Sequence, residues 1–208
     1  MSDTNRHEAA SFIQTARRAQ LVACAIEVIA EEGLARASTV RIAERAGVSR
    51  GVLTYHFTSR AELIDEVINH VYDLAGTMLL PRIAQAATPR EALREFIGGS
   101  VDLYLTHSME MAALTAIFGA AAGDEGVQRA RHERHGLEMR DLARLLEDGQ
   151  AQGQFRDFDV AVMARAIRGA LDAALSHVAQ SGEAEPYKSE LQTLFDAATT
   201  TTTAREAP

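Results

Sequence analysis

The stretch from Ile42 to Arg60 (IAERAGVSRGVLTYHFTSR) constrains the fold more than any other part of this chain. Gly47 interrupts an apolar helical pattern, and Ser49 can cap a new helix two residues later. That second helix, from Ser49 to about Phe57, is too short to be stable alone, so neighbouring helices must hold it. The spacing predicts two short helices joined by a tight glycine-containing turn, which is the helix-turn-helix arrangement.

Hydrogen-bond donors are concentrated in the same stretch. Hydroxyl groups and cations suit phosphate oxygens, and a few long side chains reach base edges in the DNA major groove. We therefore interpret the second helix as a recognition helix, with a plain helical pair in an all-α bundle as the alternative. No nucleophile or carboxylate stands beside the histidine of this stretch, so we expect no enzyme activity. The donors are Arg41, Ser49, Arg50, Thr54, Tyr55, His56 and Arg60.

Charge is distributed unevenly along the chain. The formal net charge is −8, yet residues 1–60 carry a charge of +2 and the remainder carries −10. Because DNA is polyanionic, only the N-terminal part approaches it favourably. No uncharged apolar run could cross a membrane, the N-terminus lacks a signal-peptide pattern, and Cys24 has no cysteine partner, so we expect a soluble cytoplasmic protein.

The rest of the sequence predicts helices throughout and therefore an all-α fold. Alanine is abundant and proline occurs only 4 times. Residues 1–13 show no pattern and are expected to be mobile, and Pro81 is expected to end or kink the fourth helix. The expected helices span about residues 14–32, 39–46, 49–57, 59–80, 89–107, 108–119, 125–152 and 160–180, with a last one from 186.

The string IAERAGVSRGVLTYHFTSRAEL closely resembles the signature of the TetR family of transcriptional regulators. The match covers about residues 17–75. It departs at Arg60, where the family usually has lysine, and at Thr54, where many members have an aromatic residue. The C-terminal two-thirds matches in helical layout alone, with some likeness to the BetI-type branch. The matching residues are Ile42, Ala43, Ala46, Gly47, Val48, Ser49, Gly51, Leu53, Tyr55, His56, Phe57 and Leu63.

The resemblance implies a role for each donor. Base edges would face Arg50, Gly51 and Thr54. Arg50 is the candidate for binding O6 and N7 of guanine, and a phosphate contact is its alternative. Arg17 and Arg18 oppose the dipole at the start of the first helix, so a phosphate contact or simple solvation is open for them. The phosphate contacts would come from Ser38 or Thr39, Arg41, Tyr55, His56 and Arg60.

The resemblance also implies a domain layout and a partner. We expect an N-terminal tail and DNA-binding domain at 1–60, a larger helical ligand-binding and dimerisation domain at 61–198, and a disordered tail at 199–208. The last two helices of two copies would form a four-helix bundle. Two-fold symmetry would then place the recognition helices about 34–36 Å apart, or a multiple, on a near-palindromic operator. The bundle candidates are Gly169, Ala170, Ala173, Ala174, Leu191, Leu194 and Phe195.

Several residues of the second domain are candidates for lining a small-molecule pocket, although apolar stripes at helical spacing are more often plain core. They are Met78, Leu103, Tyr104, His107, Met111, Phe118, Met163 and Ile167. His132 and His135 are three residues apart and could share a metal ion. Their segment, RARHERHGLEMRD, is dense in mixed charge and is typical of a solvated helix face, so we expect no metal and no cofactor.

These features together predict a homodimeric DNA-binding transcriptional regulator, most simply a repressor that a small molecule releases from its operator. An activator or a ligand-independent regulator of the same family is the alternative. A helical small-molecule-binding protein or an enzyme is a more distant one, because no phosphate loop, nucleophile–base pair or metal motif supports it.

Overall fold

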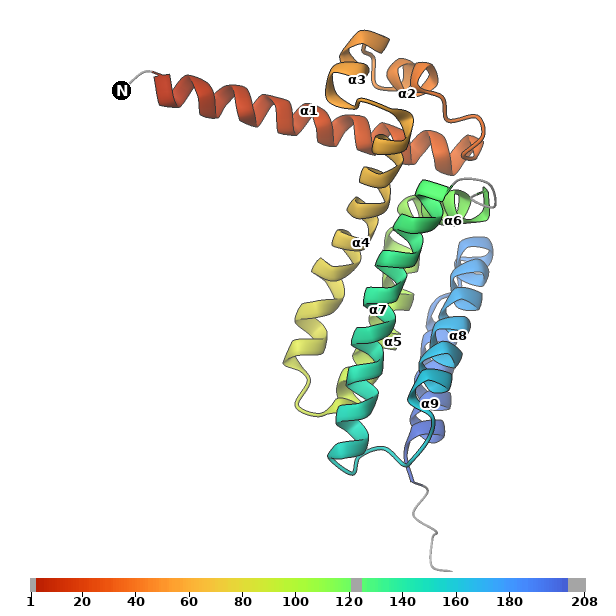
Figure 1. Ribbon diagram of the computed structural model, residues 1–208. Coiled ribbons are helices and arrows are strands. Elements are labelled where there is room, and N and C mark those ends of the chain that lie inside the picture. Colours follow the sequence, from red (N-terminus) through yellow and green to blue (C-terminus); the bar gives the residue numbers. More distant parts are fainter. Residues whose placement is uncertain (1–2, 121–124, 202–208) are drawn as a thin grey trace, which may run out of the picture. The chain divides into compact units, whose positions relative to one another are not determined.

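The computed structural model describes residues 3–120 and 125–201, with the backbone alone for 3–11, 125–128, 130–132 and 180. These ranges hold helices and no strand, which confirms the predicted all-α class (Figure 1). The helices are α1 Asp3–Glu32, α2 Thr39–Arg45, α3 Arg50–His56, α4 Arg60–Gln85, α5 Pro89–Thr106, α6 Ser108–Ala120, α7 Glu125–Ala151, α8 Val160–Ser181 and α9 Glu185–Thr199.

The chain forms two compact units. The first unit comprises residues 1–72 and 109–132, and the second comprises 73–108 and 133–208. Helices α4 and α7 each run from one unit into the other. The first half of α4 belongs with α1–α3 because Leu63, Ile64 and Val67 are buried in the same apolar core.

The core of the first unit fixes the short recognition helix. Leu21, Ile29 and Ile42, from α1 and α2, have at most 1% of their surface exposed. Leu53 and Phe57, four residues apart, insert from α3 and its C-terminal end into the same cluster. Burying a side chain of this size contributes about 1.5–3 kcal/mol. Helix α3 is therefore held by packing rather than by its own propensity.

Capping residues set the helix boundaries near the turn, as the sequence predicts. The Ser38 and Ser49 side chains accept hydrogen bonds from backbone amides in the first turns of α2 and α3. Gly47 has φ 65°, a conformation that glycine adopts without strain. Before α4, the Ser59 hydroxyl accepts from the Glu62 amide at 3.0 Å, and the Glu62 carboxylate accepts from the Thr58 amide at 2.7 Å. The turn and the start of α4 are thus specified locally.

Helix α5 forms the centre of the second unit, where it packs against α8 and α9. Its apolar face includes Leu93, Ile97 and Val101, and facing residues such as Ile167 of α8 and Phe195 of α9 are also buried. Thr88 caps the start of α5, since its side chain accepts a hydrogen bond from the Glu91 amide.

The structure corrects three details of the sequence-based prediction. Helix α1 begins at Asp3 rather than near residue 14, since this segment contains helix-forming alanine and glutamate residues. Helix α4 continues past Pro81 to Gln85, and Arg82 holds this last turn through ion pairs with carboxylates of α5 at 2.7 and 2.8 Å. Thr199, expected in the tail, is the fully buried last residue of α9.

Candidate nucleic-acid interface

Helix α3 turns one polar face outward. Arg50, Gly51, Thr54 and Tyr55 are exposed, and Tyr55 has 73% of its surface accessible. The Thr54 hydroxyl donates to the Arg50 carbonyl at 3.1 Å, so its polar group is used within the helix. These residues do not contribute to the apolar core, because the core contacts of α3 come from its buried face.

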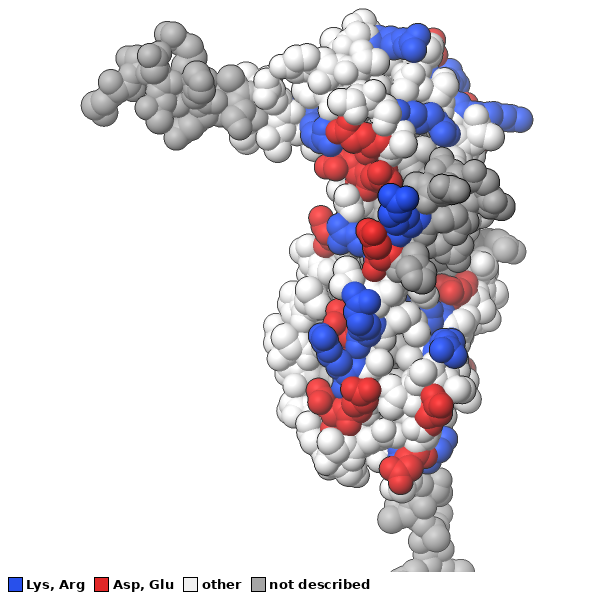
Figure 2. Space-filling model, in the orientation of Figure 1, with Lys and Arg blue, Asp and Glu red and all other residues white. Residues whose placement is uncertain are grey.

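Arg50 is distinguished from most arginines around it by its lack of an internal partner. Nε of Arg41 donates to Glu32 at 2.9 Å, and the Arg45 guanidinium donates to Glu31 at 2.5 Å. In the described part of the chain, the guanidinium of Arg50 makes no hydrogen bond or ion pair, and the same holds for Arg36 in the loop before α2. Figure 2 shows arginine side chains over the α2–α3 region. Arg50 is therefore available for an external anion.

Arg60 is engaged inside the protein. Its Nε donates to the Ala37 carbonyl at 2.9 Å, and its Nη2 donates to the Leu34 carbonyl. The planar fork of an arginine can donate to two carbonyls at once, which a lysine ammonium does with poorer geometry. In this structure, the residue that departs from the family pattern thus joins the start of α4 to the loop between α1 and α2.

Arg18 joins three helices of the first unit. Its Nη1 donates to the carbonyl of His56 at the end of α3, at 2.5 Å, and its Nη2 donates to Glu62 of α4 at 3.1 Å. The guanidinium also lies 4.1 Å from the ring centroid of Phe57, a cation–π distance. Arg17 instead donates to Gln20, one turn along α1. The sequence left a phosphate contact or simple solvation possible for Arg17 and Arg18. The structure shows that the Arg18 guanidinium is engaged in contacts within the protein.

The remaining predicted phosphate donors belong to α2, α3 and their N-caps, all in the first unit. The Tyr55 hydroxyl accepts a hydrogen bond from Gln14 of α1 at 3.2 Å, and the rings of Tyr55 and His56 meet edge to face at 5.2 Å. Ser38 and Ser49 are exposed, while Thr39 is half-buried. The structure thus gathers the predicted donors in the first unit, where no residue of the second unit is needed to place them.

The predicted ligand-binding residues are divided between the two units. Met111 and Phe118 belong to the first unit, and the other six belong to the second. Leu103, Tyr104, Met111 and Ile167 are buried core residues, while Met78, His107, Phe118 and Met163 are half-buried. His107 is the C-cap residue of α5.

Tyr104 belongs to a buried polar network that the sequence did not reveal. Its hydroxyl accepts from Arg168 of α8 at 3.1 Å, and Arg168 also donates to Glu138 of α7 and Asp172 of α8, each at 2.6 Å. Desolvation raises the pKa of Tyr104 above its ordinary value. The sequence did contain an indication of this network, because Arg168 lies at helical spacing from Ala164 and Leu171, which are buried residues of α8.

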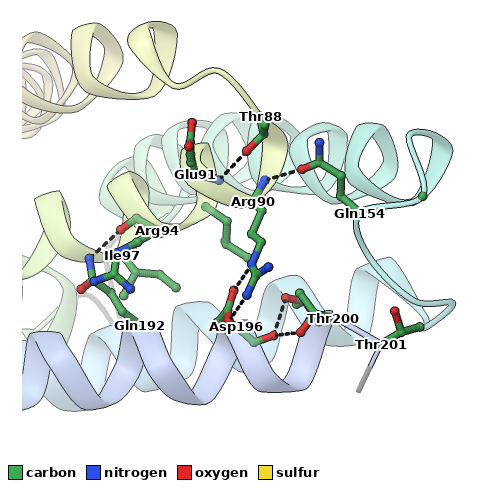
Figure 3. Close-up of a pocket in the computed structure, with 13 residues that line it drawn as sticks. Thr88, Arg90, Glu91, Arg94, Ile97, Gln154, Gln192, Asp196, Thr200 and Thr201 are labelled. Atoms are coloured by element: carbon green, nitrogen blue, oxygen red, sulfur yellow. Dashed lines mark hydrogen bonds and ion pairs between the residues drawn. The ribbon is translucent and has the colours of Figure 1, made fainter. Parts of the chain in front are cut away.

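The second unit contains a cavity of about 680 Å³ between α5, α9 and the turn that follows α7 (Figure 3). None of the eight predicted ligand-binding residues lines it. It is lined by Thr88, Arg90, Glu91, Leu93, Arg94, Ile97, Gly153, Gln154, Gln192, Asp196, Thr199, Thr200 and Thr201.

No three histidine, cysteine, aspartate or glutamate side chains among the described residues are grouped to hold a metal ion, and the side chain of His132 lies outside the described set. None of the described helices combines the length and apolar character needed to cross a membrane.

Helix α8 presents a stripe of small side chains to solvent. Ala166, Gly169 and Ala173 are exposed, and a Cβ at Gly169 would meet nothing within 4 Å. Val162 on α8 and Leu194 on α9 are 58% and 57% exposed. Ala174, Leu191 and Phe195, which were also bundle candidates, are buried within the chain, and Ala170 is half-buried.

Comparison with known proteins covers both units. Residues 21–67 match the model of bacterial regulatory proteins of the tetR family, and residues 86–188 match that of tetracyclin repressor-like C-terminal domains. The regulator BetI 1 of Chromohalobacter salexigens is 30% identical over 118 residues, which cover 56% of this chain and 58% of that relative. The chain thus spans little more than half the length of this relative.

Solved structures show the same fold over most of the chain. The ketosteroid transcriptional regulator KstR2 of Mycobacterium tuberculosis superposes with a TM-score of 0.71 at 22% identity, covering 89% of this chain and 96% of that one. AibR, solved with isovaleryl coenzyme A and operator DNA, superposes with a TM-score of 0.72 at 19% identity, covering 86% and 97%. With both family models matched in the expected order, the chain belongs to the TetR family of bacterial regulatory proteins.

Proposed function

We propose that the protein is a sequence-specific DNA-binding transcriptional regulator that acts in the cytoplasm. The observation that carries the proposal is the outward face of α3, where Arg50, which pairs with no described residue, stands beside Gly51 on a helix held by the buried Leu53 and Phe57. An arginine without an internal partner can donate its fork to O6 and N7 of guanine. AibR, which shares the fold, has been solved on operator DNA.

The donors around this face would fix the protein on the DNA backbone. Ser38, Thr39, Ser49, Tyr55 and His56 are grouped in the first unit, and contacts of this kind set position without reading sequence. Arg36 adds a further exposed cation that the sequence-based interpretation did not include. Arg41 would have to share its guanidinium with Glu32, and Arg60 with the carbonyls it already holds, so we assign these two the weaker phosphate roles.

We propose that two copies associate through α8 and α9. The exposed stripe of Ala166, Gly169 and Ala173 allows another helix to approach closely, and Val162 and Leu194 give the same surface apolar area. A two-fold dimer would present two recognition helices to a near-palindromic operator. Sedimentation of the purified protein at micromolar concentration tests this step, and a stable monomer would contradict it.

The regulator is proposed to be a repressor released by a small molecule. Helix α4 would transmit the effect of the small molecule to the DNA-binding helices, since it begins at the Arg18 and Arg60 contacts and continues into the second unit. A coupling of about 1–3 kcal/mol changes DNA affinity about 5–150-fold. An effector site around Tyr104, Met163 and Ile167 stays a prediction.

Selection of bound sequences from a random DNA pool tests the proposed function most broadly. We expect an enriched near-palindrome whose binding weakens steeply with salt. Repeating the binding measurement with candidate small molecules would distinguish a ligand-released repressor from a ligand-independent regulator. Failure to enrich any sequence would contradict the proposal and favour a helical small-molecule-binding protein.

A further inference from the structure

The cavity between α5 and α9 lies wholly within the second unit, and its residues form apolar and polar surfaces. Leu93 and Ile97 of α5 are buried at 3% and 1% exposure. Around them stand hydroxyl, amide and charged groups from α5, from α9 and from the turn after α7, as Figure 3 shows. Its volume, about 680 Å³, is within the range of about 300–1,000 Å³ that small-molecule sites occupy.

Of the two arginines that line the cavity, Arg94 is the one whose guanidinium makes no hydrogen bond or ion pair with a described residue. Arg90, one turn earlier on α5, donates both arms of its fork to Asp196 of α9 at 2.5 Å. The Arg94 carbonyl accepts a hydrogen bond from the Gln192 amide nitrogen at 2.9 Å. The hydrogen bond from Arg90 holds the pKa of Asp196 below its ordinary value, and the positive charge of Arg94 adds to this effect.

Gln192 is positioned beside Arg94 by a close helix contact. Its side chain lies over Gly98 of α5, where a Cβ would meet the Gln192 amide nitrogen at 2.5 Å. Gln192 is only 8% exposed, and its amide nitrogen donates a hydrogen bond to the Arg94 carbonyl at 2.9 Å. Its amide oxygen accepts no hydrogen bond from a described residue, so it can accept one from a ligand hydroxyl.

Three backbone amides at the start of α5 are engaged within the protein. The Glu91 amide donates to Thr88, the Arg90 amide donates to Gln154, and the Ala87 amide donates to the Glu91 carboxylate. An anion would therefore be held by side chains rather than by the helix end. Since Asp196 and Glu91 also line the cavity, one negative charge suits it better than two.

We propose that the α5–α9 cavity binds a small hydroxylated monocarboxylate. The carboxylate would pair with the Arg94 guanidinium, and hydroxyl groups would bond the Gln192 amide oxygen and the hydroxyls of Thr200 and Thr201. A quaternary ammonium compound is disfavoured, because none of the lining residues is aromatic and Arg94 repels cations. The site is separate from the predicted apolar pocket, and its existence does not depend on the proposed function.

Isothermal titration calorimetry of the full chain without DNA tests the site. The probes are glycerate, gluconate and quinate, with sorbitol as the uncharged comparison and propionate as the carboxylate without hydroxyls. We expect at least one hydroxy acid to bind more tightly than both comparisons. Absence of binding by all three, or binding no tighter than sorbitol or propionate, would overturn the proposal.

Matched variants locate any binding. Arg94→Ala and the more conservative Arg94→Gln should weaken the hydroxy acid at least tenfold, and Gln192→Leu should weaken it several-fold while leaving propionate unchanged. Arg144→Ala removes an exposed arginine of α7 that does not line the cavity, so it should bind like the wild type. Equal affinity of Arg94→Ala, Arg94→Gln and the wild type would overturn the assignment. Circular dichroism checks that each variant is folded.

Discussion

Replacement of Arg168 by alanine is expected to destabilise the second unit by about 3 kcal/mol. The Arg168 side chain is 15% exposed and connects α5, α7 and α8 through Tyr104, Glu138 and Asp172. Breaking a buried ion pair by removing one partner costs about 3–5 kcal/mol. The lower end applies because Asp172 is 59% exposed and is rehydrated, whereas Glu138 is 23% exposed and the Tyr104 hydroxyl is buried.

Urea denaturation and differential scanning calorimetry at one fixed protein concentration measure this loss. For a chain of this size, about 3 kcal/mol corresponds to a fall of about 6–12 °C in Tm. The Arg144→Ala control should change stability by less than about 0.5 kcal/mol, since that side chain is 73% exposed. A loss for Arg168→Ala no larger than that of the control would refute the reasoning.

A combined replacement separates desolvation from packing. The triple variant Arg168→Met, Glu138→Leu and Tyr104→Phe removes the polar network while keeping most of its volume. Replacing a buried ionic network by apolar side chains is often neutral or stabilising, so this variant should recover most of the loss. If it is as unstable as Arg168→Ala, the cost arises from altered shape rather than from unpaired polar groups.

Three further predictions concern other contacts. Arg60→Ala should lower the stability of the first unit in urea denaturation and weaken binding to all DNA sequences, with Arg60→Lys intermediate; wild-type stability of Arg60→Ala would contradict this. The pKa of Asp102 is low because hydrogen bonds from Arg82 and Lys188 outweigh its desolvation. Its stabilising effect is therefore present above the unfolded pKa of about 4 and is lost as the pH falls through the lower folded pKa, so Asp102→Asn should flatten the acid limb of a stability–pH series. Gly169→Leu should give a folded monomer by light scattering, and an intact dimer would argue against the α8 surface.

The two short helices of the helix-turn-helix and their caps were accessible from the sequence because their signals are local. Ser38, Gly47 and Ser49 act within a few residues of their own positions, and the spacing of Leu53 and Phe57 marks the buried face of α3. The continuation of α4 beyond Pro81 was not accessible in this way. It depends on ion pairs of Arg82 with α5, and pairing of residues distant in sequence leaves no local pattern.

In the candidate site, too, features with a local sequence signal were predicted and features that depend on distant residues were not. Exposure of Arg50 follows from the helical periodicity, whereas the engagement of Arg18 and Arg60 depends on where the carbonyls of His56, Ala37 and Leu34 lie in three dimensions. A donor-rich stretch predicts a phosphate-binding surface without telling which arginines the protein uses internally. For the same reason the sequence did not place Arg94 and Gln192 in one cavity, since 98 residues separate them.

Fluorescence anisotropy with the selected operator and a scrambled duplex tests the central claim, that Arg50 reads base identity from the exposed face of α3. The wild type should prefer the operator strongly. Arg50→Ala should lose about 1–3 kcal/mol on the operator and much less on the scrambled duplex, so that the preference narrows. Equal losses on both duplexes would show that Arg50 contacts phosphate and would contradict the claim.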